Sequence, residues 1–157
     1  MIDALIAERK KKLEALRRAG VDPYPADARR THTIQAVLAS FASFERKKKR
    51  LAVVGRVSGF RNQGNLVFVD LKDQSGAIQL VVKKDVLRGD FTLFRDALDI
   101  GDFVGASGTV FKTKRGERSV EVASIQFLAK SLRPLPGEWH GFTDTEMRLR
   151  RRYLDLL

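Results

Sequence analysis

One segment of the sequence carries an aromatic side chain where its pattern predicts solvent. In "LVFVDLKDQSGAIQLVV", residues 66–82, apolar and polar residues alternate, as they do in β-strands with one buried face. Val67, Val69 and Leu71 share one face, so Phe68 shares the other face with an aspartate and a lysine. A ring on the wet side of a sheet is a candidate for ligand binding.

The second apolar run of this segment places a carboxamide on the same outer side. Gln79 alternates with aliphatic residues that form the inner face of its run. The sequence "DQSG" at 73–76 predicts a tight turn between the two runs. Folding at that turn brings Phe68 opposite Gln79 or one diagonal step away, within reach of one ligand.

This pair has a chemistry that suits an unpaired nucleobase. An aromatic face stacks on a base for about 1–3 kcal/mol, and a carboxamide both donates to and accepts from the Watson–Crick edge of a base. The alternative is structural, with Phe68 packed beneath a loop or under the N-terminal helices. We expect the binding role, in which stacking holds the base and the amide discriminates.

Polar residues in two loops extend this candidate site. A small barrel would bring Arg61 and Glu117 to the rim of the same face, where they contact a ligand or serve only as a solvated charge and a balancing charge. Glu117 stands among Lys112, Lys114 and Arg115, so attraction of phosphates is not its role. A carboxylate there accepts a hydrogen bond from a base, while the three cations suit phosphates.

The sequence shows no catalytic set. His32 and His140 lie far apart and lack the spacing of metal ligands or of a triad, and there is no cysteine. No phosphate-binding Gly-x-x-x-x-Gly-Lys loop occurs. We therefore expect neither an enzymatic activity nor a cofactor or metal in these 157 residues.

Composition favours a polyanionic partner. Thirty Lys and Arg against nineteen Asp and Glu give a formal net charge of +11, much of it in basic runs at 9–12, 46–50, 112–115 and 148–152. No apolar run is long enough to cross a bilayer and no signal peptide is evident, so we expect no membrane partner and a cytoplasmic location.

The periodicities predict two helices followed by a β-rich region. An amphipathic helix spans 2–19, and a short one begins after Thr33 as N-cap and runs to Phe41, followed by a basic loop. Predicted strands follow at 51–60, 66–71, 77–82, 102–111 and 119–128, with a helix at 90–99. The order β-β-β-α-β-β is typical of a five-stranded OB-fold barrel, although an SH3-like or other small barrel remains an alternative.

This reading divides the chain into three parts. Residues 1–50 form a helical extension, residues 51–130 form the OB-fold domain, and residues 131–157 form a Pro- and Gly-containing linker that ends in a helical pattern. That last pattern has no cap and no apolar partner, so we expect the chain to be the N-terminal part of a longer protein.

Several motifs resemble the N-terminal region of bacterial class II lysyl-tRNA synthetases. They are "RKKKLEALRRAGVDPYP", "FVDLKDQSGAIQLVV", "LDIGDFVGASGTVFKTKRGE", "LRPLP" and "WHGFTDTEMRLRRRYLDLL", which cover nearly the whole chain in the family's order. The resemblance implies an anticodon-binding domain for tRNA, with residues 131–157 entering a catalytic domain that is absent here. It also implies that the lysine, ATP and Mg sites of an aminoacyl-tRNA ligase belong to that domain, and that the parent is a homodimer.

The resemblance also implies roles for four residues. Phe68 matches the stacking phenylalanine, Gln79 the strand-three glutamine, Arg61 the first-strand arginine and Glu117 the glutamate of the "TKxGE" turn. Aspartyl and asparaginyl enzymes share this face because their tRNAs share the central anticodon uridine, so these four residues do not choose the amino acid. The loop "FRNQGN" at 60–65 and the arginine in the turn depart from the family pattern.

Two other functions remain as alternatives. A sequence-tolerant single-strand-binding protein would bind any unpaired oligonucleotide with similar affinity. A protein-interaction module would not be saturated by RNA.

Overall fold

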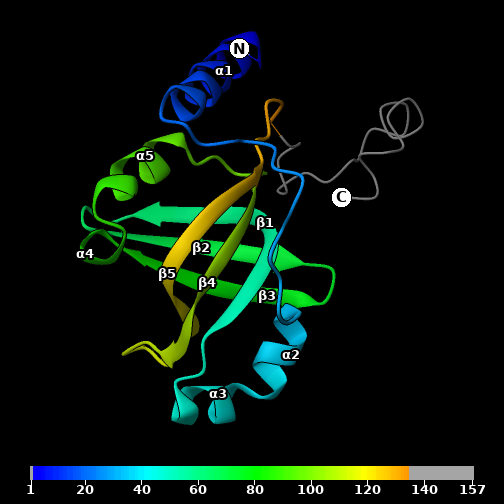
Figure 1. Ribbon diagram of the computed structural model, residues 1–157, viewed down its shortest axis with the longest axis vertical. Coiled ribbons are helices and arrows are strands. Elements are labelled where there is room, and N and C mark those ends of the chain that lie inside the picture. Colours follow the sequence, from blue (N-terminus) through cyan, green and yellow to red (C-terminus); the bar gives the residue numbers. More distant parts are fainter. Residues whose placement is uncertain (1, 135–157) are drawn as a thin grey trace.

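The computed structural model describes residues 2–134. These residues form a β-barrel with helices at its two ends. Its helices are α1 (Ile2–Arg18), α2 (Ile34–Ala39), α3 (Phe41–Lys47), α4 (Lys84–Leu87) and α5 (Gly89–Ala97). Its strands are β1 (Leu51–Asn62), β2 (Leu66–Asp73), β3 (Gly76–Lys83), β4 (Phe103–Lys112) and β5 (Arg118–Ala129). Helices α1 and α5 lie at one end of the barrel, and α2 and α3 lie at the other (Figure 1).

The five strands close in the order β1-β2-β3-β5-β4, with β3 and β5 parallel and all other pairs antiparallel. Side chains along each strand alternate between the inside and the outside of the barrel. Val67, Val69 and Leu71 of β2 are fully buried inside, as are Leu80 and Val82 of β3, and their burial stabilises the closed barrel. The predicted five-stranded OB-fold barrel with preceding helices is confirmed.

Three local predictions were wrong. The single helix expected after Thr33 and up to Phe41 is two helices, because α2 ends and α3 begins at Ser40. Helix α3 reaches Lys47, although we expected a loop there, because Phe41 and Phe44 recur at helical spacing and are buried against the core. The short α4 was not predicted, since its four residues include no buried side chain. The predicted helical pattern at the end of residues 131–157 lies outside the described residues.

A buried ion pair fixes the point at which the chain leaves the barrel. The Lys130 ammonium is fully buried and donates to Asp102 Oδ2 at 2.9 Å and to Asp99. Asp102 also accepts from the backbone N–H groups of Asp99 and Ser131, each at 2.8 Å. Burial raises the pKa of Asp102, while the Lys130 charge opposes this rise.

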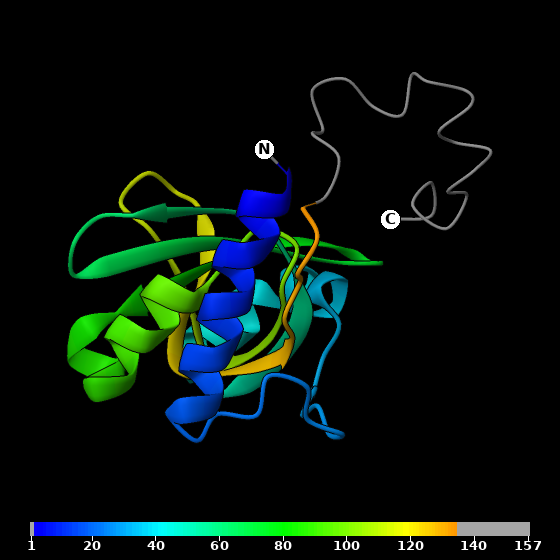
Figure 2. The same cartoon turned by 90° about the horizontal axis from the view of Figure 1, so that it is seen from above.

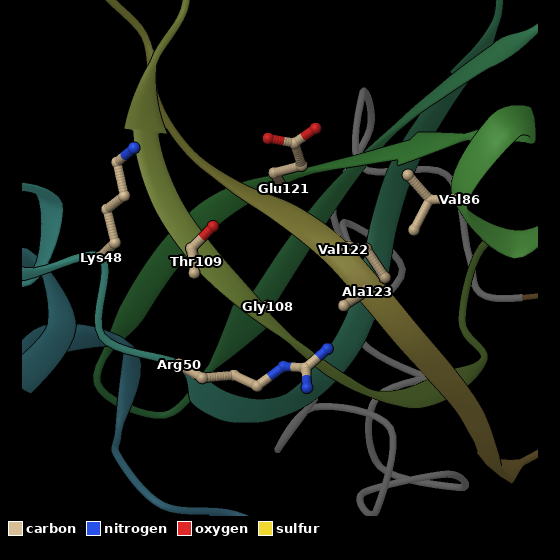
Figure 3. A pocket seen from close by; sticks show the side chains of 8 residues that line it. All are labelled: Lys48, Arg50, Val86, Gly108, Thr109, Glu121, Val122 and Ala123. Atoms are coloured by element: carbon tan, nitrogen blue, oxygen red, sulfur yellow. The ribbon is translucent and has the colours of Figure 1, made fainter.

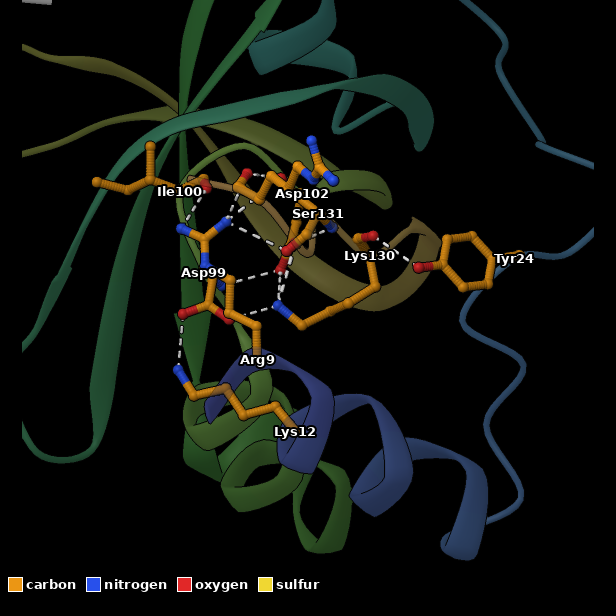
Figure 4. A network of polar contacts seen from close by, with 9 residues as sticks. Arg9, Lys12, Tyr24, Asp99, Ile100, Asp102, Lys130 and Ser131 are labelled. Atoms are coloured by element: carbon orange, nitrogen blue, oxygen red, sulfur yellow. Dashed lines mark hydrogen bonds and ion pairs between the residues drawn. The ribbon is translucent and has the colours of Figure 1, made fainter. Parts of the chain in front are cut away.

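The same network holds α1 against the barrel (Figure 4). Lys12 of α1 pairs with Asp99 at 2.7 Å, and Arg9 donates to carbonyl oxygens of Ile100 and Ser131. Helix α1 thus lies alongside α5, as both views show (Figure 2). The N-terminal helix is therefore held both by these polar contacts and by its buried Leu13 and Leu16.

Asp73 organises the turn that sets the register of β2 and β3. Its Oδ1 accepts from the N–H groups of Ser75 and Gly76, and its Oδ2 accepts from the N–H of Ile34 at the start of α2. Burial alone would raise the pKa of Asp73, but these hydrogen bonds outweigh it and hold the pKa below its ordinary value.

We predict that Asp73 makes stability depend on pH in acid. Because its pKa is lowered in the folded state, its contribution is present at neutral pH and is lost as pH falls through that lowered pKa. Asp73→Asn should lower the free energy of unfolding by about 1 kcal/mol at pH 7 and flatten its fall below pH 4. Urea unfolding from pH 2.5 to 7 measures both effects. The exposed Asp27→Asn is the control, and equal effects in the two variants would contradict the prediction.

We also predict that Lys130 and Asp102 are energetically coupled. Lys130→Met should lower the free energy of unfolding by about 3–5 kcal/mol, because it leaves a buried carboxylate without its cation. Adding Asp102→Asn removes that charge while keeping an oxygen acceptor, so it should recover part of the loss. Denaturant unfolding of both single variants and the double variant tests this, and strict additivity would contradict it.

Candidate nucleic-acid interface

Phe68 lies on the outer face of β2, half-buried, between two strands that frame it. It pairs across the sheet with Arg61 of β1 and with Val81 of β3. The residues before and after it, Val67 and Val69, point inside and are fully buried. The ring is not part of the buried core cluster, so Phe68 points outward, as predicted.

Arg61 presents its cation to this ring. The guanidinium carbon lies 5.9 Å from the centre of the Phe68 ring, within the range of a cation–π interaction. Its Nη2 lies 3.9 Å from Asp70 Oδ1, and the Arg61 side chain is 60% exposed. Arg61 therefore lies beside the ring with most of its surface open to a ligand.

Gln79 lies one diagonal step from Phe68, because it pairs with Asp70, two residues further along β2. We expected its side chain on an open surface, but Gln79 is only 9% exposed. Its Oε1 accepts a hydrogen bond from Ser119 Oγ of β5 at 3.0 Å. The neighbouring parallel strand covers the amide, which alternation within one strand does not predict.

This hydrogen bond leaves the other end of the amide unpaired. Among residues 2–134, no fully buried side-chain nitrogen or oxygen lacks a partner, and Gln79 Nε2 makes no hydrogen bond. That nitrogen therefore reaches the surface. With Oε1 engaged by Ser119, Gln79 offers a ligand a donor.

Glu117 stands exposed at the end of a rigid turn between β4 and β5. The Thr113 N–H donates to the Glu117 carbonyl at 2.9 Å, and the Glu117 N–H donates to Thr113 Oγ1 at 3.0 Å. Gly116 closes the turn at φ 83°, a conformation that glycine adopts readily. The Glu117 carbonyl also lies 3.4 Å from Ser119 Oγ, so this hydroxyl connects the turn to Gln79.

The three predicted phosphate-binding cations lie along the same hairpin. Lys112 ends β4, and its backbone N–H donates to the Glu45 carboxylate of α3 at 3.1 Å. The side chains of Lys112, Lys114 and Arg115 are exposed. The structure thus brings Arg61, Phe68 and Gln79 together, links Glu117 to them through Ser119, and leaves the cations on the adjoining hairpin.

Sequence reasoning missed Ser119 and Asp70 as members of this site. Ser119 is fully buried and fixes the Gln79 amide, while Asp70 lies beside Arg61 and opposite Gln79. Only the pairing of β3 with β5 reveals the first of these relations, and that pairing joins segments 40 residues apart.

Other residues considered for chemistry have structural surroundings. The His32 ring packs edge-on against Phe44, with centroids 5.1 Å apart, and hydrogen-bonds to Thr31. Within the described range no three metal-ligating side chains cluster. His140 falls outside that range. None of the described helices is both long and apolar enough to span a membrane.

The closed five-stranded barrel is that of an OB-fold domain. Comparison with known families agrees, because residues 51–128 match the tRNA anti-codon family, described as an OB-fold nucleic acid binding domain. The barrel of this chain belongs to that family.

The chain as a whole is homologous to lysine–tRNA ligases, which confirms the resemblance in the sequence. It is 48% identical over 158 residues to the lysine–tRNA ligase of Roseiflexus castenholzii, and 42% identical to those of Carboxydothermus hydrogenoformans and Xylella fastidiosa. Each comparison covers 99% of this chain and 32% of the relative. The chain therefore spans about a third of the length of these relatives.

We predict that Ser119 holds Gln79 in place. Ser119→Ala should lower the free energy of unfolding by about 0.5–1.5 kcal/mol, because it leaves Gln79 Oε1 without its partner in a largely buried position. The control is Ser124→Ala on the same strand, which removes only an exposed hydrogen bond to Ser107. Chemical denaturation compares the two, and an equal loss in both would contradict a special role for Ser119.

Proposed function

We propose that this chain is the anticodon-binding region of a lysine–tRNA ligase, and that the outer face of β1, β2 and β3 reads the anticodon. The single observation that supports this most is the juxtaposition of the outward Phe68 ring with the Arg61 guanidinium and the Gln79 amide. The homology to lysine–tRNA ligases supports tRNA as the ligand of this face.

In this proposal Phe68 is the platform on which one anticodon base stacks. A splayed-out base covers the open side of the ring, and the Arg61 guanidinium stacks beside it or contacts a neighbouring phosphate. The ring is half-buried and belongs to a strand that is paired on both sides, so little conformational entropy is lost on binding.

Gln79 and Glu117 supply the discrimination. Gln79 Nε2 is the available donor, and uracil presents acceptor oxygens where cytosine presents an amino donor, so a donor here favours uridine. The exposed Glu117 carboxylate accepts from the imino N–H of uracil. Together these groups select the central uridine of the anticodon.

The exposed cations of the β4–β5 hairpin contact phosphates without regard to sequence. Lys112, Lys114 and Arg115 add affinity that weakens steeply with salt, because each contact releases counterions. The longer protein would use ATP and Mg²⁺ at sites outside this chain to attach lysine to tRNA, as a cytoplasmic homodimer. The domain boundaries near residues 50 and 130 belong to the same proposal.

Phe68→Ala tests the stacking platform. It should weaken binding of a UUU anticodon stem-loop by about 1–3 kcal/mol, or roughly 5- to 150-fold in Kd. Fluorescence titration measures this. A matched control is Phe103→Ala, since Phe103 is also half-buried and carries a guanidinium, that of Arg56, 4.6 Å from its ring centre on another part of the barrel.

A second stem-loop, with cytidine as the middle anticodon base, separates specific reading from general binding. The chain should bind it roughly tenfold more weakly, and Gln79→Ala should reduce that difference. Equal affinity for both stem-loops would refute specific reading and favour a sequence-tolerant single-strand-binding protein. Failure of any RNA titration to saturate would favour a protein-interaction module.

A further inference from the structure

A concave surface lies near the proposed reading face and takes no part in the proposed function described above. It is a groove over β4 and β5, open to solvent, and we call it the basic groove. Its lining residues are Lys48, Arg50, Val86, Gly108, Thr109, Glu121, Val122 and Ala123. Lys48 and Arg50 extend from the segment before β1 on one side, and Val86 of α4 lies on the other (Figure 3).

The net charge of this groove is positive. Its one carboxylate, that of Glu121, is paired with the Lys83 ammonium at 2.5 Å and so is neutralised. Lys48 and Arg50 are exposed and form no ion pair with any residue that the structure describes. By contrast, the Lys49 ammonium between them lies 5.5 Å from the Phe44 ring centre. Two cations therefore remain available for an anion.

The backbone conformation positions these cations, and a glycine leaves part of the bottom of the groove without a side chain. Lys48 is the C-cap of α3 at φ 47°, a left-handed conformation that is uncommon for a residue with a side chain. Hydrogen bonds from the Lys48 and Lys49 N–H groups to the last turn of α3 hold it there. Gly108 forms part of the floor, and a Cβ on it would lie only 1.9 Å from the Glu121 carbonyl oxygen.

Strand register connects the groove to the stacking platform. Phe68 pairs with Val81, Val81 with Glu121, and Glu121 with Thr109, so one row of side chains crosses four strands. Three strand spacings of about 4.8 Å separate the two ends of this row, roughly 14 Å in all. Glu121 and Thr109 line the groove, so the row that begins at Phe68 ends in the groove.

We propose that the basic groove binds the phosphodiester backbone of the RNA strand that flanks the stacked base. Lys48 and Arg50 contact phosphates within a few nucleotides of that base, and the exposed Val86 packs against the sugar between them. The inference rests on the proposed function, because it extends the path of the same RNA strand. It assigns to the groove a sequence-independent share of affinity.

The first test removes both charges. Lys48→Gln with Arg50→Gln should weaken binding of the UUU and UCU stem-loops by the same factor, and should reduce the slope of log Kd against log salt by about 1.4. The control, Lys10→Gln with Arg18→Gln, removes one exposed lysine and one exposed arginine from α1 at the other end of the barrel. An unchanged slope in the groove variant, or an equal change in the control, would overturn the proposal.

The second test locates the phosphates. Stem-loops that carry a single neutral methylphosphonate at successive positions around the middle anticodon base are titrated against the chain and the groove variant. At one or two positions the chain should lose affinity while the groove variant loses none, since it lacks the paired charges. Equal losses in both proteins at every position would overturn the proposal.

The outcomes separate this inference from the proposed function. If the middle base makes no difference to affinity but the slope and the methylphosphonate effects appear, base reading fails while the groove stands. If Phe68→Ala and the middle base act as expected but the groove variant binds like the unaltered chain, the groove proposal alone fails.

Discussion

The buried contact between Lys130 and Asp102 is the constraint on which the arrangement of this molecule depends. It lies where β5 ends, in a place without solvent, so neither charge is tolerated without the other. Each carboxylate oxygen of Asp102 accepts from Lys130 and also from one backbone N–H, that of Ser131 for Oδ1 and that of Asp99 for Oδ2. Because Lys12 and Arg9 of α1 join the same network, one polar cluster fixes the end of the barrel, the exit of the chain and the N-terminal helix.

The register of the strands brings the residues of the candidate site together. Arg61, Phe68 and Val81 form one row across β1, β2 and β3, while Asp70, Gln79 and Ser119 form the next row across β2, β3 and β5. A slip of one residue in β2 would turn Phe68 into the core and its buried neighbours outward. Asp73 opposes such a slip, because its hydrogen bonds close the β2–β3 turn and link the turn to α2.

Alternation along a single strand is enough to predict much of this from sequence. It gives the outward Phe68, the buried residues beside it, and the order of strands that defines the barrel. It does not give the burial of Gln79, because that depends on β5 lying parallel to β3, a contact between distant segments. For the same reason Ser119 was missed, since nothing local marks a serine that caps another strand's amide.

Helix ends show the same limit. Thr33 is recognisable as an N-cap, and its side chain does accept from the Ala36 N–H. The basic run at 46–50, in contrast, suggests a loop by composition alone, while the buried Phe41 and Phe44 extend helix α3 into it. Tertiary packing therefore decides where Lys48 lies, and with it the existence of the basic groove.

In the proposed function, the distribution of charge on the barrel assigns affinity for RNA and specificity for its bases to different parts of the surface. On the outer face two cations lie beside anions, Arg61 near Asp70 and Lys83 against Glu121, which lowers the net charge next to Phe68 and Val81. Where charges are paired in this way, a surface discriminates by stacking and hydrogen bonds, since a strong general field would hold every sequence equally well. Exposed cations that form no ion pair with a described residue lie, among other places, on the β4–β5 hairpin and before β1, at the margins of the face. In the proposed function, the cations at the margins would position an RNA strand through its phosphates, while the centre of the face would test its bases.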